Sequence, residues 1–231
     1  AREIGAWRKG VRGMMNGAGV IDAINQQATQ ATRARYNRIA PVYDLIEKLS
    51  ERRFKPWRDK LWAAVPAGRV LEVGVGTGKN FAYHPRGAVM TGIDLADQML
   101  ARAKARAQQL GQTIDLREMD AQALTFADHT FDAAVATFVF CSVPDPLRGL
   151  QEMARVVRPD GRIFLLEHVR LNKPIIGRIM DWLNAIVVRL WGANINRRTV
   201  ENIQRAGLQI ESLESLGPMG MVKFMVARPQ K

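Results

Sequence analysis

The spacing of hydrophobic positions changes between two periods along the middle of the chain. Short apolar runs rich in β-branched residues predict buried strands, and the longer segments between them repeat at helical spacing. The clearest helix spans residues 97–110, with an acid at its start and Gly111 directly after it. We expect strands at 70–75, 88–93, 114–119, 131–137 and 161–167, and helices at 78–84, 97–110 and 146–157. This alternation predicts an α/β fold, in which helices cover both faces of a parallel sheet.

The two ends of the chain depart from this alternation. The residues before Gly68 carry helical patterns, whereas the tail has strand-like runs at 208–216 and 221–227. A tight turn containing glycine and proline joins these two runs, so they can pair antiparallel. With 231 residues and 47% hydrophobic content, the chain can bury one full core. We therefore expect one main domain that closes with an antiparallel strand pair.

The strongest chemical signal follows the first predicted strand. Gly74, Gly76 and Gly78 alternate directly after an apolar run, and the next predicted strand ends in an acid, Asp94. A strand, a glycine turn, a helix, a strand and a terminal acid form the βαβ unit that binds nucleosides. In such units the glycines let the backbone approach the ligand, and the acid accepts hydrogen bonds from ribose hydroxyls.

The details of this signal favour one kind of nucleoside. The third glycine comes one residue earlier than in dinucleotide-binding turns, and Lys79 occupies the position of their last glycine. Glu72 precedes the turn by two residues, where a carboxylate would repel a pyrophosphate but would favour an amino group. S-adenosylmethionine (SAM) has an amino group, a ribose and no phosphate. Residues 72–78, 92–95 and 119–121 resemble, in this order, the SAM-contacting motifs of class I methyltransferases.

This resemblance covers residues 33–228 and implies a Rossmann-like class I methyltransferase fold, with a seven-stranded, mostly parallel sheet and an antiparallel last strand. It places the glycines under the methionyl group, Asp94 at the ribose, and Asp120 at the adenine amino group. A merely structural alternative is that these two acids cap helices. The resemblance implies SAM contacts for Glu72, Gly74, Gly76, Gly78, Asp94, Leu95, Met99, Asp120, Ala121 and Phe138.

The ends of the fourth and fifth strands are expected to line the acceptor side, because ligands bind at the carboxyl ends of parallel strands. Phe138 and Phe140 offer aromatic faces that suit a sulfonium or an ammonium group, although Phe140 could equally be a core residue. His168 is a candidate proton acceptor or orienting donor, with a structural role as the alternative.

An upstream segment resembles a known lid. Residues 35–44 resemble the Tyr-x-x-x-Ala-x-x-Tyr-Asp lid of quinone-biosynthesis and phospholipid methyltransferases. The resemblance implies that Tyr36 and Tyr43 close over SAM and the acceptor, and we take both, with His168, as catalytic candidates. The alternative is that the two rings pack on the sheet edge.

Residues 174–199 combine an apolar helical stripe with two arginines. The stripe is followed by Arg197 and Arg198, and this combination suits an acyl chain beside a phosphate. We therefore take Arg197, Arg198 and Phe140 as candidate substrate-binding residues. An amphipathic helix that simply covers the sheet would explain the stripe, but not the arginines.

Charge is concentrated at the two ends. The net charge of +12 divides into +7 over residues 1–60 (13 basic, 6 acidic), −1 over 61–160 (10 basic, 11 acidic) and +6 over 161–231 (11 basic, 5 acidic). This distribution indicates a polyanionic partner at the ends. An RNA-binding protein is the alternative, but the basic runs lack interleaved aromatic residues, so we expect no nucleic acid.

The first residues resemble a membrane-surface segment. An apolar stripe that includes Trp7 runs beside Arg8 and Lys9, and glycines weaken this helix in water. We divide the chain into 1–30, a basic amphipathic membrane-binding helix that orders mainly on lipid, and 31–231, the methyltransferase domain. A disordered basic tail is the alternative.

Other features limit the site and its location. A single cysteine excludes an internal disulfide and fits a reducing compartment, and no His/Cys cluster has the spacing of metal ligands. No uninterrupted apolar stretch reaches the length of a membrane span. We expect a monomer in the cytoplasm, bound peripherally to the anionic inner face of the cell membrane, with no metal.

Residues 35–44, 138–143 and 166–169 further resemble the bacterial phosphatidylethanolamine N-methyltransferase family. This resemblance implies SAM-dependent methylation of phosphatidylethanolamine, in one step or in successive steps to phosphatidylcholine. The alternatives are a quinone-biosynthesis C-methyltransferase, a small-molecule thiol methyltransferase and a SAM-binding regulator without activity.

Overall fold

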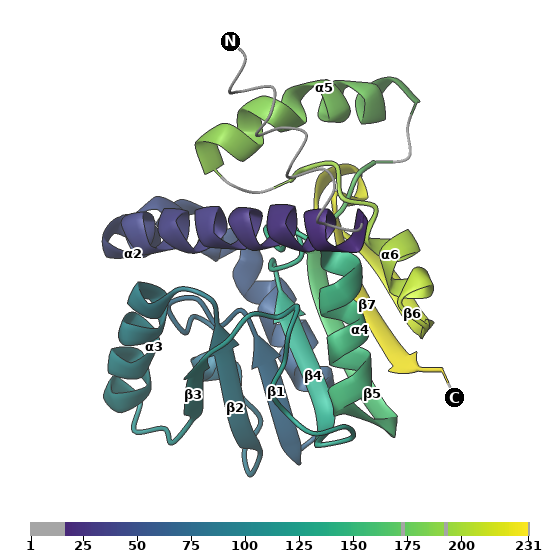
Figure 1. Ribbon diagram of the computed structural model, residues 1–231. Coiled ribbons are helices and arrows are strands. Elements are labelled where there is room, and N and C mark those ends of the chain that lie inside the picture. The colour runs from purple at the N-terminus through teal and green to yellow at the C-terminus, as the bar shows by residue number, and fades with distance from the viewer. Residues whose placement is uncertain (1–16, 172–173, 192–193, 231) are drawn as a thin grey trace.

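The structure is a computed structural model that describes residues 17–171, 174–191 and 194–230 (Figure 1). Seven strands form one sheet in the order β3-β2-β1-β4-β5-β7-β6. The strands are β1 (Arg69–Val73), β2 (Val89–Asp94), β3 (Asp115–Glu118), β4 (Phe131–Thr137), β5 (Val157–His168), β6 (Leu208–Leu216) and β7 (Val222–Pro229). The helices are α2 (Gly17–Ala64), α3 (Asp97–Gln109), α4 (Pro146–Val156), α5 (Pro174–Trp191) and α6 (Thr199–Arg205), with 3₁₀ turns η1 (Phe81–Tyr83) and η2 (Pro218–Gly220).

The sheet confirms the predicted fold class. Strands β1 to β5 pair in parallel, and β7 pairs antiparallel with β5 on one side and with β6 on the other. The predicted strand bounds 131–137 and 208–216 agree with β4 and β6. The fold is therefore the seven-stranded, mostly parallel class I methyltransferase sheet.

Both faces of the sheet are buried, which explains why its central strands are almost uniformly apolar. Side chains alternate along each strand, so Leu71 joins one core cluster with α4 while its neighbour Val70 joins the opposite cluster. Leu61 and Trp62, near the end of α2, belong to this second cluster. The sheet thus anchors the carboxyl-terminal part of α2, and the rest of that helix is free to extend over other elements.

Helix α2 is the least expected element. Its 48 residues continue through Pro41 and Pro56, although each proline removes one backbone donor from the helix. Figure 1 shows its first turns crossing above the carboxyl edge of the sheet, between the sheet and α5. The predicted boundary at residue 30 lies inside this helix. Residues 1–16, the larger part of the expected membrane-binding segment, lie outside the described residues.

The prediction of a helix at 78–84 is wrong. A turn and the three-residue 3₁₀ element η1 occupy this segment instead. Gly74, Gly76 and Gly78 have φ values of 70°, 55° and 79°, in the left-handed region where other residues are strained. The ring of Phe81 lies 2.5 Å from the position that a Cβ on Gly78 would occupy. A right-handed helix therefore does not begin at Gly78, and the close contact with Phe81 excludes a side chain there.

No helix within the described ranges has both the length and the apolar character that crossing a bilayer requires.

Candidate functional site

A cavity with about 840 Å³ of empty space, including solvent at its mouth, lies between the carboxyl ends of the central strands and α2. Ten of the predicted site residues line it, namely Tyr36, Tyr43, Gly74, Gly76, Asp94, Leu95, Met99, Asp120, Ala121 and Phe138. Most of them follow the parallel strands, whose carboxyl ends share one edge of the sheet, whereas Tyr36 and Tyr43 come from α2 and Met99 comes from α3.

The glycine turn forms the floor of this cavity. The backbone N–H groups of Gly74 and Val75 both donate to the carbonyl of Ile93, at 2.8 and 3.0 Å, which ties the turn to the end of β2. A Cβ on Gly74 would lie 2.5 Å from Val139, whereas a Cβ on Gly76 would meet no atom within 4 Å. The turn is therefore packed at Gly74 and open at Gly76, where a ligand can approach the backbone.

Asp94 lies at the end of β2 and is oriented by the backbone. Its carboxylate accepts hydrogen bonds from the N–H groups of Gly76 (2.8 Å) and Ala96 (2.9 Å). Burial raises the pKa of Asp94 to about 6, although these two hydrogen bonds act in the opposite direction. Each carboxylate oxygen can accept a further hydrogen bond, so this group fits a pair of ribose hydroxyls.

Asp120 lies after β3 and is oriented by Gln122. Its carboxylate accepts from the backbone N–H of Gln122 at 2.9 Å and from the side-chain amide of the same residue at 2.9 and 3.0 Å. Met99 and Ala121, both buried, supply apolar surface beside it. An apolar slot with a carboxylate at its edge fits an adenine ring and its amino group.

Helix α2 forms the wall opposite the strands. Tyr36, Tyr43, Glu47 and Arg58 all line the cavity. They are separated by 7, 4 and 11 residues, which places them on one face of a continuous helix. The two tyrosines were predicted from the sequence, whereas Glu47 and Arg58 were not. Their helical spacing from Tyr43 is the signal that could have found them.

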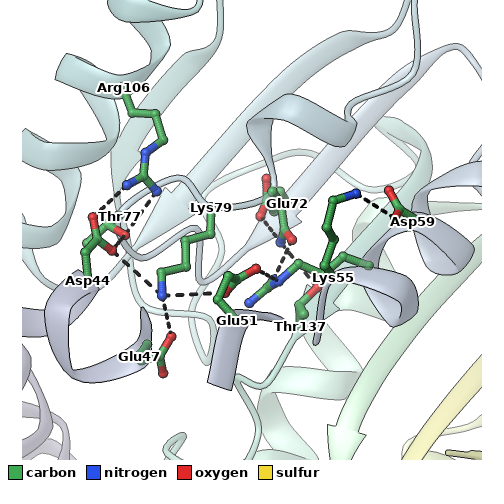
Figure 2. Close-up of polar contacts among 12 residues, drawn as sticks. Asp44, Glu47, Glu51, Lys55, Asp59, Glu72, Thr77, Lys79, Arg106 and Thr137 are labelled. Atoms are coloured by element: carbon green, nitrogen blue, oxygen red, sulfur yellow. Dashed lines mark hydrogen bonds and ion pairs between the residues drawn. The ribbon is translucent and has the colours of Figure 1, made fainter. Parts of the chain in front are cut away.

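Ion pairs fasten this wall to the glycine turn. Lys79 Nζ lies 2.8 Å from Glu47, 3.5 Å from Glu51 and 3.9 Å from Asp44, all on α2. Arg106 of α3 pairs with the same Asp44 at 2.6 Å. Figure 2 shows Lys79 between the three carboxylates. In the sequence, Lys79 occupies the position where the dinucleotide pattern has a glycine. Lys79 therefore holds the lid helix on the turn.

The two lid tyrosines are neutral phenols. Burial raises the pKa of Tyr36 well above its usual value. The pKa of Tyr43 is also raised, mainly by burial and to a smaller extent by the negative charge of Glu47. The Tyr36 hydroxyl lies 2.6 Å from the hydroxyl of Ser142, a further lining residue that the sequence did not identify. Neither phenol can serve as a base near neutral pH, so both are suited to orienting a ligand.

The loop after β4 is held in a strained conformation beside the cavity. Phe138 has φ +59°, which is unusual for an aromatic residue. One side-chain oxygen of the fully buried Glu167, Oε1, accepts hydrogen bonds from the N–H groups of Val139 (2.9 Å) and Phe140 (3.2 Å). Burial raises the pKa of Glu167 to about 8. Glu167 thus fixes the loop that presents Phe138 to the ligand.

Six predicted residues do not line the cavity: Glu72, Gly78, Phe140, His168, Arg197 and Arg198. Phe140 is a core residue, as its alternative reading held. The ring of His168 packs against Phe138 and Phe54, at centroid distances of 4.7 and 6.1 Å, and burial lowers its pKa. A neutral histidine behind Phe138 is placed to support that ring.

The two arginines do not act as a pair. The guanidinium of Arg197 donates to the backbone carbonyl of Val143 at 2.7 Å, and Val143 lines the cavity. Arg198 is exposed and lies 3.4 Å from Glu201. Arg197 therefore supports the cavity wall, and a phosphate contact for either residue stays a prediction.

Comparisons with known proteins agree with this geometry. Residues 71–165 match the family described as a methyltransferase domain. A phosphatidylethanolamine N-methyltransferase of Cereibacter sphaeroides is 44% identical over 108 residues, which are 46% of this chain and 53% of the relative. The ubiquinone/menaquinone biosynthesis C-methyltransferase UbiE of Roseobacter denitrificans is 32% identical over 169 residues, which are 69% of this chain and 68% of the relative. The alignments with the first curated relatives span only about half of those proteins' lengths.

Solved structures share the fold. A Pyrococcus horikoshii protein has a TM-score of 0.66 at 19% identity, with 85% of this chain and 99% of that chain covered. A SAM-dependent methyltransferase of Thermotoga maritima has a TM-score of 0.65 at 20% identity, with 86% and 100% covered. The cavity, with its open glycine turn and two strand-end carboxylates, has the groups that bind SAM, and the chain belongs to the class I SAM-dependent methyltransferases.

Proposed function

We propose that this methyltransferase transfers the methyl group of SAM to the amine of phosphatidylethanolamine at a membrane surface, in one or more steps. The observation that carries the proposal is the composition of the α2 wall. Tyr36, Tyr43 and Glu47 line the same cavity as the SAM-binding residues. Aromatic faces and a carboxylate attract ammonium groups, both the protonated substrate and a methylated product. The 44% identity to a phosphatidylethanolamine N-methyltransferase supports the same acceptor.

The chemistry requires alignment and the removal of a proton. SAM supplies an electrophilic methyl group, which the nitrogen lone pair attacks as the carbon–sulfur bond breaks. An ammonium has no lone pair, so its proton must leave first. We assign Glu47 as the acceptor of this proton, because both lid tyrosines stay protonated and His168 lies behind Phe138. The tyrosines align the amine, and α2 shields the cavity from water.

A second surface supports a lipid substrate. Val42, Leu45 and Ile46 are 47%, 73% and 55% exposed, and they lie on the side of α2 that is turned away from the cavity. The exposed Arg38 and Arg53 share this face by helical spacing, and neither has a hydrogen-bond or ion-pair partner among the described residues. Exposed apolar side chains beside free arginines are typical of a helix that binds an anionic bilayer. This surface, which we call the α2 outer face, would hold the cavity close to lipid head groups.

A liposome assay tests the acceptor. The chain is incubated with labelled SAM and vesicles that contain phosphatidylethanolamine, and the lipid fraction is extracted. We expect label in phosphatidylethanolamine derivatives, and a large loss of that label with Glu47→Gln. Label that appears only when a demethylated quinone precursor is supplied would contradict the proposal.

Vesicle binding tests the α2 outer face separately. We expect the double variant Leu45→Glu and Ile46→Glu to bind anionic vesicles at least about tenfold more weakly, because it buries less apolar surface and adds two negative charges. The matched control is Val89→Glu, since Val89 is 65% exposed and begins β2 at the opposite edge of the sheet. Equal binding by both variants would contradict a role for this face.

A quinone-ring C-methyltransferase is the second candidate. The relatives named as ubiquinone/menaquinone C-methyltransferases are 32–34% identical, and their alignments extend over up to 69% of this chain, further than the 46% of the phospholipid relative. The liposome assay distinguishes the two acceptors when lipid and quinone fractions are extracted from the same reaction.

A further inference from the structure

A buried cation in the cavity wall has no assigned role. The side chain of Arg58 comes from α2, is almost fully buried and lines the cavity. Its Nε donates to Glu51 at 3.0 Å and its Nη1 donates to Asn80 at 2.6 Å. These two bonds leave the Nη2 amino group for another acceptor. Burying a guanidinium is costly unless acceptors surround it. Glu51 already pairs with this charge, and the place of Arg58 in the wall leaves its remaining amino group available to an anionic group in the cavity.

A chain of buried polar groups holds this guanidinium in place. Asn80 accepts from Arg58 through its carbonyl oxygen and donates to Glu72 through its amide nitrogen at 2.7 Å. The other oxygen of Glu72 lies 2.8 Å from Nε2 of His84. Because the Asn80 oxygen faces a guanidinium and its nitrogen faces a carboxylate, the amide can adopt only one orientation. Glu72 does not line the cavity, and the Asn80 amide connects it to Arg58, which does.

The position of these buried polar groups indicates which part of SAM lies beside Arg58. Asp120 and Asp94 occupy the adenosine end, after β3 and β2. The methionyl group must then extend over the ends of β1 and β4, past Gly74 and Thr137. The Asn80 amide lies 3.3 Å from the Thr137 hydroxyl, which places the Arg58 guanidinium beside that end of the cavity. The methionyl group ends in an amino group and a carboxylate, and the carboxylate is the natural partner of a guanidinium.

We propose that Arg58 binds the carboxylate of the SAM methionyl group, and that Asn80, Glu72 and His84 are positioning residues that orient Arg58. This inference rests on SAM binding and is independent of the methyl acceptor. A lipid phosphate is the competing anion, and the experiment separates the two.

Calorimetry with two ligands tests the contact. SAM and decarboxylated SAM differ only in the carboxylate, and charge-assisted pairs change affinity by about 10- to 100-fold. We expect the unaltered chain to prefer SAM by about this factor, and Arg58→Gln to abolish the preference by weakening SAM alone. Arg58→Lys, which keeps the charge but not the planar fork, should retain part of it. If the unaltered protein binds SAM and decarboxylated SAM equally well, that result alone overturns the proposal, and no variant needs to be measured.

Two further outcomes would also overturn it. Equal losses for SAM and decarboxylated SAM would make Arg58 a purely structural residue. An unchanged SAM affinity with a raised KM for the lipid would assign Arg58 to a phosphate. The matched control is Lys55→Gln on the same helix, because Lys55 is exposed and pairs only with Asp59 among the described carboxylates. This control should bind both ligands normally.

A separate measurement tests whether Asn80 positions Arg58. Asn80→Ala removes the acceptor of Arg58 Nη1 but keeps the guanidinium. We expect the preference for SAM over decarboxylated SAM to fall about tenfold, while affinity for decarboxylated SAM changes little. A loss of thermal stability without a change in this ratio would show that Asn80 does not position Arg58.

Discussion

The two sides of the cavity are built by different means. On the strand side, backbone groups fix the geometry, because left-handed glycines shape the turn and two backbone N–H groups orient Asp94. On the α2 side, side chains fix the geometry, and the helix is fastened to the turn by Lys79 and its three carboxylates. Substituting a charged side chain leaves the geometry of a backbone turn unchanged, but it removes the ion pairs which that side chain forms. The strand side should therefore be rigid, and the α2 side should respond to charge substitutions.

The largest expected effect is on the strand side. Asp94→Ala removes the acceptor of the ribose hydroxyls and of the Gly76 N–H, so we expect SAM affinity to fall at least about 100-fold. Calorimetry with SAM measures the change. The control is Asp115→Ala, an exposed acid on neighbouring β3, which should leave the affinity unaltered. Vesicle binding should be the same in both variants, and a matching loss there would contradict a separate lipid surface.

The pH dependence of SAM binding should follow the same carboxylate. Burial raises the pKa of Asp94 to about 6, and ribose hydroxyls favour the ionised form. Affinity should therefore weaken as pH falls below 6, by up to about tenfold per pH unit. The folded pKa lies above the usual value of 3.8, so the unliganded protein binds the proton more tightly when folded. This group's contribution to the free energy of unfolding should accordingly rise as pH falls from about 6 to 4.

These opposite pH trends are measurable on one sample. Calorimetry between pH 5 and 8 follows SAM affinity, and urea unfolding follows stability over the same range. A SAM affinity that is flat across pH 6, with Asp94→Asn equally flat, would show that the carboxylate does not titrate in binding.

A smaller effect is expected on the α2 side. Lys79→Met removes the cation shared by Glu47, Glu51 and Asp44, so we expect the free energy of unfolding to fall by about 1–2 kcal/mol. SAM affinity should fall only several-fold, because the strand side stays intact. Urea unfolding and calorimetry measure the two effects. Lys55→Met removes an exposed ion pair on the same helix and should change neither quantity.

The strand side was also the more predictable side. Strand bounds and the cofactor motif depend on short stretches such as residues 70–78, where β-branched residues and glycines each have strong local preferences. The expected helix at 78–84 was wrong in the same region, because Gly78 itself is left-handed and only the short 3₁₀ element η1 follows it.

The α2 side depends on contacts that the sequence does not reveal locally. Prolines normally end or kink a helix, so Pro41 and Pro56 gave no indication that one helix continues through this segment. That continuous helix places Glu47 and Arg58 on the same face as Tyr36. The direction in which the Glu72 side chain points could not be predicted from the sequence either. Its partners Asn80 and His84 follow the glycine turn, and only the folded turn brings them back to the strand.

Hydrogen exchange with and without S-adenosylhomocysteine tests most directly whether α2 completes the cofactor site. We predict slower exchange at residues 74–78 and also along α2 between residues 32 and 58, because both walls of the cavity contact the ligand. Slower exchange at residues 74–78 alone, with α2 unaffected, would contradict the account.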